Sequence, residues 1–212
     1  MKPTKRTQLG RLPNRGAYDS VTIHGILDAA FLAHVGFQAD GQPIVIPTLY
    51  GREENKLYLH GSAASRMLRE LESGVPACVT VTIVDGFVLA RSAFHHSMNY
   101  RSVVAFGIAR KIDGAEEKER ALRVISEHLM AGRWEDVRPP TAKELKATAV
   151  LEFAIEEASA KIRTGPPVDD EDDYSLPVWA GVLPVVLEEK EPIADSRLAK
   201  ATPVPKYIRR AR

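Results

Sequence analysis

The sequence predicts an α+β protein, mainly β, in which a β-barrel carries a few flanking helices. About six to eight segments rich in β-branched residues follow one another through short turns, mostly in antiparallel order. The few amphipathic helices stand between these segments. The 212 residues suffice for one substantial domain, and the 44% hydrophobic and 27% charged content is typical of a soluble globular protein.

The composition also limits the partners. A formal net charge of +1 gives no field that would attract nucleic acid or an acidic membrane. The single cysteine, Cys78, cannot form an internal disulfide and fits a reducing cytoplasm. The basic N-terminus has no apolar run after it, and no apolar stretch is long enough to cross a bilayer. We therefore expect a cytoplasmic protein with no signal peptide and no membrane span.

The chain divides into three regions by composition. Residues 1–16 are basic and polar and are expected to form a flexible N-terminal arm. Residues 17–187 carry the predicted strands and helices and are expected to form the barrel domain. Residues 188–212 have little apolar periodicity, so we expect an extended C-terminal tail.

The first half of the chain is expected to contain two helices and three strands. Asp19 and Ser20 are good N-caps, so the first element is a helix. The second and third strands are expected to form a hairpin across the turn "REENK". In chain order the elements are a helix over 21–29, strands over 30–37, 43–50 and 56–61, and a helix over 62–74.

The second half opens with a predicted β-hairpin around Asp85-Gly86, a pair suited to positive φ between two runs of strand-forming residues. A later helix carries Leu122, Ile125 and Leu129 on its core face. A Pro-rich acidic loop precedes the last strand. The elements are the hairpin over 76–94, a strand over 100–113, the helix over 115–132, and strands over 148–163 and 178–189.

The strand-to-helix junction "HGSAASR" is the first candidate site. Free N–H groups and the positive dipole end at a helix start favour an anion. Ser62 and Ser65 add hydroxyl donors, Arg66 adds a forked cation that suits phosphate oxygens, and Gly61 lets a ligand approach the backbone. The simpler alternative for this segment alone is an N-cap serine and a solvated arginine.

The stretch "ARSAFHHSMNYRSVVAFG" is the second candidate, because Arg101 and Ser102 follow a cluster of polar side chains. His95 and His96 are adjacent, so in extended backbone they point to opposite faces and chelate one ion poorly. The spacings typical of zinc sites are missing, and we expect no metal site.

A third candidate is "SAKIR", where Lys161 and Arg163 share one strand face and could add positive charge to an anion site. Motifs for other chemistries are missing. The sequence contains no P-loop, no G-x-G-x-x-G after a strand, and no nucleophile elbow. A Rossmann nucleotide site and a catalytic triad therefore have no support.

Taken together, these segments resemble the pyridoxamine 5′-phosphate oxidase-like, FMN-binding split-barrel family. The resemblance is closer to the branch of nitroimidazole-resistance-type flavin-binding proteins. It covers about residues 18–184 and implies an FMN-binding split β-barrel with flanking helices, acting as a homodimer with FMN in a cleft at its interface. The segments that carry it, in order, are "DGQPIVIPTLYG", "KLYLHGSAASRML", "FHHSMNYRSVVAFG", "SAKIRTGPP" and "WAGVLP".

The resemblance implies how the barrel holds the flavin. The strand from Ile46 to Leu49 would lie along the isoalloxazine ring and give it backbone hydrogen bonds. His60 would lie near the ribityl-phosphate, and Arg66 with the neighbouring serines would hold the phosphate. The residues of this part of the implied site are Ile46, Pro47, Thr48, Leu49, His60, Ser62, Ser65 and Arg66.

The remaining implied contacts come from later strands. Arg101 and Ser102 match an Arg-Gln pair of the family, and the shorter Ser102 replaces the Gln that contacts the ring. The family holds the phosphate with an Arg-Lys pair, and the matching pair here is Ser65-Arg66. Lys161 or Arg163 could supply the missing cation.

The resemblance implies an FMN-dependent oxidoreductase that takes hydride from a reduced nicotinamide and reduces a small acceptor, such as a nitroaromatic. We do not find the C-terminal arginine and histidine motif of true pyridoxamine phosphate oxidases, so that reaction is disfavoured. No catalytic residue is assigned. His24, His95 and His96 are the candidates for proton transfer.

Three alternatives stay open. The first is a non-catalytic flavin-binding module that stores, senses or carries FMN. The second is a haem-binding relative on the same barrel, with His34, His95 or His96 as the axial ligand. The third is an empty interaction domain. A yellow protein, a Soret band or the lack of any flavin uptake would distinguish them.

Overall fold

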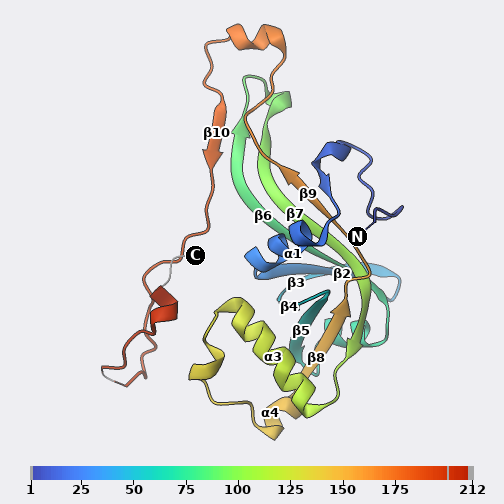
Figure 1. Ribbon diagram of the computed structural model, residues 1–212, viewed down its shortest axis with the longest axis vertical. Coiled ribbons are helices and arrows are strands. Elements are labelled where there is room, and N and C mark those ends of the chain that lie inside the picture. Colours follow the sequence, from blue (N-terminus) through green and yellow to red (C-terminus); the bar gives the residue numbers. More distant parts are fainter. Residues whose placement is uncertain (1, 200, 210–212) are drawn as a thin grey trace.

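The computed structural model describes residues 2–199 and 201–209, and these residues form a ten-stranded sheet with antiparallel pairing (Figure 1). Its strands run in the order β3-β2-β6-β7-β8-β5-β4, with β9 beside β7 and β10 beside β6. The strands are β1 (Gly16–Ala17), β2 (Leu32–Ala39), β3 (Gln42–Leu49), β4 (Gly51–Glu53), β5 (Lys56–Ser62), β6 (Pro76–Leu89), β7 (Ser97–Lys111), β8 (Thr148–Ala154), β9 (Glu157–Arg163) and β10 (Gly181–Pro184). The helices are α1 (Ser20–Ala29), α2 (Arg66–Glu72), α3 (Ala115–Leu129) and α4 (Ala142–Ala147).

The barrel is open between β3 and β5. β3 pairs along its length with β2, and β5 pairs along its length with β8, whereas only the first three residues of β5 pair with the short β4. Tyr50 links β3 to β4, and its buried hydroxyl lies within hydrogen-bond distance of the carbonyls of Leu27 and Ala30. The expected hairpin between the second and third strands is therefore wrong. Anchoring Tyr50 beneath α1 directs β3 towards β2 and leaves its outer edge unpaired within the described residues.

The two faces of β5 contact different apolar clusters. Leu57 and Leu59 belong to the large cluster inside the barrel, while Tyr58 packs on the other side against Ala121 and Ile125 of α3. Alternate residues of a strand point to opposite faces. His60 therefore shares the face of Tyr58 and points out of the barrel, towards α3.

The expected turn at Asp85-Gly86 is also wrong, because β6 runs through this pair as one strand. Its pairing with β7 shifts register between Val84 and Gly86, which marks a β-bulge. The φ of Gly86 is not positive. β10 lies close instead, since a Cβ on Gly86 would come 3.0 Å from the carbonyl oxygen of Leu183. This glycine allows close strand packing rather than a turn.

The long strands β6 and β7 extend beyond the barrel as an arm (Figure 1). The chain turns at the tip of this arm through a short helix, η2 (Ala93–His95). The strand expected over 148–163 is two strands, because β7 has two different neighbours along its length. Its barrel end pairs with β8, and its arm end pairs with β9.

Both ends of the chain make contacts with the folded part. In the N-terminal arm, Thr7 is buried, and the side chains of Thr4 and Arg6 contact Glu157 of β9. Beyond β10, Tyr207 donates a hydrogen bond of 2.5 Å to Asp136. The domain boundaries at 17 and 187 stay predictions. No helix among the described residues is long and apolar enough to cross a membrane.

Candidate functional site

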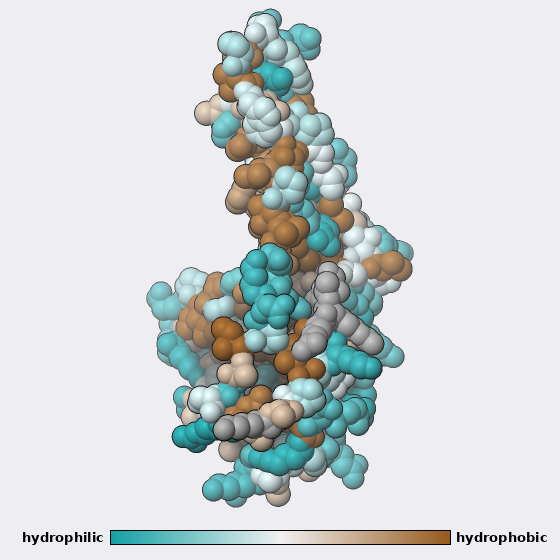
Figure 2. Space-filling model, turned by 90° about the vertical axis from the view of Figure 1, so that its left-hand side faces the viewer, coloured by the Kyte–Doolittle hydropathy of each residue, from teal (hydrophilic) through white to brown (hydrophobic). Residues whose placement is uncertain are grey.

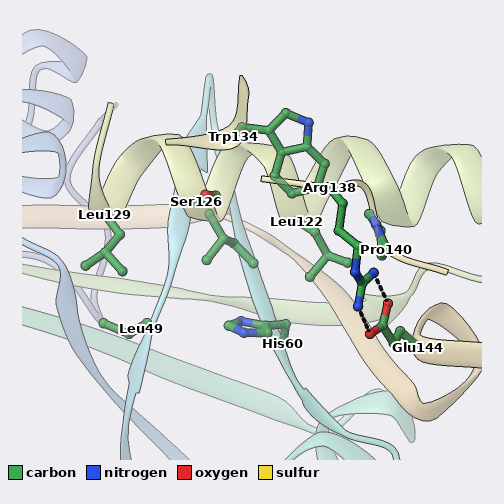
Figure 3. Close-up of a pocket in the computed structure, with 10 residues that line it drawn as sticks. Leu49, His60, Leu122, Ser126, Leu129, Trp134, Arg138, Pro140 and Glu144 are labelled. Carbon is green, nitrogen blue, oxygen red and sulfur yellow. Dashed lines mark hydrogen bonds and ion pairs between the residues drawn. The ribbon is translucent and has the colours of Figure 1, made fainter. Parts of the chain in front are cut away.

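A pocket of about 490 Å³ lies beside the opening of the barrel, between β5 and α3 (Figure 3). Leu122 and Leu129 hang from α3 towards His60, and the segment between α3 and α4 closes the far end. The lining residues are Leu49, His60, Leu122, Ile125, Ser126, Leu129, Trp134, Arg138, Pro140 and Glu144.

The apolar face of α3 forms the roof of this pocket. The predicted core residues of this face are only partly in the core, because Ile125 is 5% exposed and Leu129 is 40% exposed. α3 approaches β4 closely at Gly51, where a Cβ would lie 2.7 Å from the backbone nitrogen of Ile125. The helix therefore sits directly on β4 and projects its remaining apolar side chains over the open part of the barrel.

His60 is the polar group at the base of the pocket. Its Nδ1 is buried and has no hydrogen-bond partner among the described residues. Leaving such an atom unpaired costs about 1–3 kcal/mol, so it calls for an explanation. Burial lowers the pKa of His60 below its ordinary value, which favours the neutral ring. A neutral imidazole can donate or accept a hydrogen bond, or bind a metal.

An ion pair stands at the end of the pocket opposite Leu49 (Figure 3). The guanidinium of Arg138 donates hydrogen bonds of 2.5 and 2.8 Å to the carboxylate of Glu144. Glu144 also accepts from the backbone of Thr141 and completes the capping box at the start of α4. Arg138 and this capping box lower the pKa of Glu144 to about 2. The pair holds a forked cation at the pocket mouth.

The predicted ring-binding strand, β3, presents two faces. Ile46 packs on the barrel core, and the alternation places Thr48 on the same side. Leu49 lines the pocket, and Pro47 is exposed. Pro47 has no N–H to donate, so the hydrogen bonds that β3 donates to β2 must come from other residues of the strand. The carbonyl of Leu49 accepts a hydrogen bond of 3.1 Å from the hydroxyl of Thr48.

The residues predicted to bind the flavin phosphate lie at and just after the end of β5, close to His60 in sequence. Ser62 accepts a hydrogen bond from the Ala64 amide at 3.2 Å, and Ser65 caps the seven-residue helix α2. Arg66 is half-exposed, with its guanidinium 3.7 Å from the carboxylate of Asp40. These contacts match the simpler alternative of a cap and a solvated arginine. Both serine hydroxyls act as acceptors in these contacts, so each O–H can still donate a hydrogen bond to an anion. Anion binding by these residues stays a prediction.

The other predicted residues lie in the arm. Arg101 donates hydrogen bonds of 2.7 and 3.0 Å to the carboxylate of Asp85, at the bulge of β6. Ser102 of β7 lies opposite Lys161 of β9 and donates to its carbonyl. Arg163 is buried and donates to backbone carbonyls of the following loop, so it serves the fold. The arm residues and His60 thus come from different parts of the chain.

The histidines considered for proton transfer or as a haem ligand lie away from the pocket. His24 pairs with Asn55 at 3.1 Å, and His34 is exposed on β2. His95 lies 3.3 Å from the carboxylate of Asp170, and His96 accepts from the backbone of the arm tip. No group of three or more metal-binding side chains gathers within the described residues.

Sequence reasoning missed the part of the pocket that follows α3. Trp134 and Arg138 belong to a segment without apolar periodicity, and no strand or helix was expected there. One signal was available, because Thr141 and Glu144 have the spacing of a capping box and mark the start of α4. That signal places a helix but does not indicate that it borders a pocket.

Comparisons with known proteins give a consistent picture. A family model described as "Pyridoxamine 5'-phosphate oxidase" matches residues 19–162. The chain is similar to the flavocytochrome Anf3 from Azotobacter vinelandii, with 44% identity over 97% of this chain and 96% of that chain and a TM-score of 0.91. It is also similar to the FAD and haem binding protein from Mycobacterium smegmatis, with 36% identity, coverage of 92% and 96%, and a TM-score of 0.88.

A more distant structure shares the fold alone. It is described as a 5-nitroimidazole antibiotic resistance protein from Bacteroides thetaiotaomicron, and it is 24% identical over 69% of this chain and 87% of that chain, with a TM-score of 0.57. No curated protein matches the chain. The fold expected from the sequence, a split barrel with flanking helices, is confirmed.

Proposed function

From the premise that this chain belongs to the pyridoxamine 5′-phosphate oxidase family, we propose that it is a flavin-dependent oxidoreductase. The observation that carries this proposal is that the outer edge of β3, which pairs with no strand among the described residues, lies beside the apolar pocket between β5 and α3. A flat ring suits such a place, because the edge offers backbone hydrogen bonds and the pocket offers apolar contact.

The residues of this chain would bind and orient the flavin. The backbone of Leu49, at the open edge, would contact the ring, while Ser62 and Arg66 would hold the phosphate. We propose FMN as the flavin, and since a 36% identical relative is named for FAD, both are tested. When bound, the flavin supplies the hydride and electron chemistry.

A homodimer would explain why the implied site residues come from two places. Arg101, Ser102 and Lys161 lie in the arm, and the arm of a second copy could bring them to the cleft. Figure 2 shows apolar side chains gathered along the arm. Phe87 of β6 and Leu183 of β10 are 48% and 54% exposed. Such exposure is common at protein–protein interfaces.

The reaction that we propose is transfer of hydride from a reduced nicotinamide, by way of the flavin, to a small acceptor such as a nitroaromatic. We propose that it takes place in the cytoplasm. The protein would orient the donor against the ring and exclude water. A turnover assay with reduced nicotinamide tests this step. If the flavin-loaded protein shows no turnover with any acceptor, the non-catalytic flavin-binding module replaces this proposal.

Flavin titration tests the site itself. The stripped protein is titrated with FMN and with FAD while flavin fluorescence is followed. Arg66→Ala and Ser62→Ala are each expected to weaken binding about tenfold, since each removes a hydrogen bond to a charged phosphate. Arg69→Ala, an exposed arginine one turn later in α2, is the matched control. Equal affinity of Arg66→Ala and the control would overturn the phosphate assignment.

Haem binding alongside flavin is a second candidate function. Two relatives at 44% and 36% identity are described as a flavocytochrome and as an FAD and haem binding protein. The side chain of His60 lines the apolar pocket, and its buried Nδ1 has no hydrogen-bond partner among the described residues. A bound haem would add one-electron chemistry. A Soret band in the purified protein supports this candidate.

A further inference from the structure

We propose that the N-terminal arm forms a basic docking surface for a small acidic electron-carrier protein, which supplies electrons to the flavin in addition to the reduced nicotinamide. The basic surface is defined as the side chains of Lys2, Lys5, Arg11 and Arg15. The inference rests on the proposed oxidoreductase function and names a second electron donor for it.

The charge of the chain is divided unevenly. Residues 1–15 contain five basic side chains and no acidic one, which gives this segment a formal charge of +5. The whole chain carries +1, so residues 16–212 together carry the difference of −4. A basic segment on an otherwise acidic molecule concentrates the positive potential in one place. The small overall charge therefore conceals a surface that attracts anions.

Contacts with β9 and β7 fix the first part of the N-terminal arm. The carboxylate of Glu157 accepts hydrogen bonds from the side chains of Thr4 and Arg6. The guanidinium of Arg6 also lies over the ring of Phe106, 5.3 Å from its centroid, and Thr7 is buried. The fold thus uses Arg6 itself, and it holds the neighbouring cations on an ordered backbone.

A second attachment fixes the end of the N-terminal arm. The amide of Leu9 donates a hydrogen bond of 3.0 Å to the hydroxyl of Tyr18. β1 pairs with β9, and Gly16 lies opposite Lys161 (Figure 1). Lys161 is four residues beyond Glu157 on β9. At the usual rise of a strand, the two attachments are about 13 Å apart. The N-terminal arm is therefore part of the folded surface along this strand.

The side chains of the basic surface have no counter-charges within the described part of the chain. Lys2, Lys5 and Arg11 are exposed, and none of them forms an ion pair or a side-chain hydrogen bond with another described residue. Arg15 lies near the buried Arg163. Burial lowers the pKa of Arg163, and the positive charge of Arg15 lowers it further. Like charges that the fold holds together without a counter-ion favour the approach of an anionic partner.

The basic surface lies next to residues of the proposed flavin site. Ser102 of β7 lies opposite Lys161 of β9, and both are residues that the proposed function brings to the flavin. Since Gly16 pairs with Lys161, a protein bound to the basic surface would stand beside them. The basic surface is therefore placed to receive an electron donor.

Exposed charges suit a partner that binds briefly. An exposed ion pair contributes little affinity, whereas complementary charges speed the encounter, and a carrier must leave after each transfer. Electron-transfer complexes are accordingly small and transient. The rival occupants are the exposed acidic residues Glu171 and Asp172 of a second copy and a nucleic acid. A permanent contact between copies needs a larger apolar area, and a long polyanion would also meet the acidic remainder of the molecule.

The electron count equals that of the nicotinamide reaction. A hydride carries two electrons and one proton. Two reduced one-electron carriers would each be oxidised by one electron, and solvent would supply the proton, so the same total reaches the flavin. The small acceptor is then reduced as in the proposed reaction.

The test is a calorimetric titration of the flavin-loaded full chain with a plant-type [2Fe–2S] ferredoxin, an acidic one-electron carrier. We expect saturable binding that weakens about tenfold between about 0.02 M and about 0.2 M NaCl, because salt screens exposed charges. Lys5→Glu combined with Arg11→Glu should weaken binding at least about tenfold. Lys143→Glu combined with Lys146→Glu, which reverses two exposed cations of α4, is the matched control and should stay within about twofold.

Three results would overturn the docking surface. The first is no ferredoxin binding at low salt, and the second is equal weakening in the two double variants. The third is a fall in mass from dimer to monomer in the Lys5 and Arg11 double variant, measured by light scattering, which would assign the basic surface to a contact between copies. Tighter binding of a labelled DNA duplex than of ferredoxin would likewise assign it to nucleic acid.

Electron delivery is measured separately from docking. Under anaerobic conditions, reduced ferredoxin should bleach the flavin absorbance of the parent, and about tenfold more slowly in the Lys5 and Arg11 double variant. Turnover with reduced nicotinamide should be equal in the two proteins. Docking without bleaching would contradict electron delivery and leave the nicotinamide reaction standing. A chain that binds no flavin would instead overturn the proposed function, while the ferredoxin titration would still test the basic surface.

Discussion

Gly51 of β4 and Ile125 of α3 are in backbone contact: a Cβ on Gly51 would lie 2.7 Å from both the nitrogen and the Cα of Ile125. A backbone cannot move aside as a flexible side chain can. The absence of a side chain at residue 51 therefore sets how closely α3 lies over β5, and with it the height of the pocket roof.

Gly51→Ala is expected to destabilise the protein. The methyl group must push α3 outward, and overpacking of this kind costs about 1–3 kcal/mol. Urea unfolding followed by circular dichroism measures the loss. Gly25→Ala in α1 is the control, because a Cβ there meets nothing within 4 Å and alanine favours a helix. Equal midpoints for the two variants would contradict the proposed role of Gly51.

Glu152 is expected to contribute more to the stability of the fold than exposed charged residues do. Its buried carboxylate accepts from Lys56 at 2.9 Å and from Arg110 at 3.1 Å. Burial acts to raise the pKa of Glu152, but these hydrogen bonds outweigh it and lower the pKa. Glu152→Gln should cost about 1–3 kcal/mol in denaturant unfolding. Glu135→Gln removes an exposed ion pair with Arg123 and should cost less than about 1 kcal/mol.

The stability of the protein should fall on mild acidification because of His60. The unfolded ring has an ordinary pKa near 6.5, and burial lowers it in the fold. Below that pH the unfolded state binds more protons, so the free energy of unfolding decreases as pH falls. Urea unfolding at about pH 7 and about pH 5 should show a smaller pH difference in His60→Gln than in the parent. An equal pH difference in His60→Gln and in the parent would contradict this role of His60.

Arg101 should contribute to flavin binding only if a second copy brings the arm to the cleft. Arg101→Ala removes a partly exposed pair with Asp85, so its effect on stability should stay below about 1 kcal/mol. FMN affinity should fall about tenfold if the guanidinium contacts the flavin across a dimer. Fluorescence titration and light scattering measure affinity and mass. Unchanged affinity in a dimer would remove Arg101 from the site.

Local patterns predicted the elements well, and pairing less well. The strand over 43–50 follows from alternation, but the same alternation does not indicate that β3 pairs with β2 and leaves one edge open. Asp85-Gly86 has the composition of a turn, but Gly86 is needed because β10, about a hundred residues later, packs against it. These outcomes depend on contacts distant in sequence.

The pocket, too, could not be predicted from local sequence patterns alone. Helical spacing correctly grouped Leu122, Ile125 and Leu129 on one face. Whether such a face closes a core or roofs a cavity depends on the strands beneath it. Here the barrel opens under α3, so part of the stripe remains unburied. His60 was named from the family resemblance, while its isolation from partners became visible only with α3 in place.

The open edge of β3 also bears on self-association. An unpaired strand edge is a template for pairing with other chains and a route to fibrils. Pro43 and Pro47 alternate with Val45 on this edge and supply no N–H. An incoming strand would therefore meet a row of carbonyls with every second donor missing, whereas a small molecule needs only one or two of those groups. We therefore expect the prolines to hinder amyloid-like growth at this edge without blocking a small molecule there.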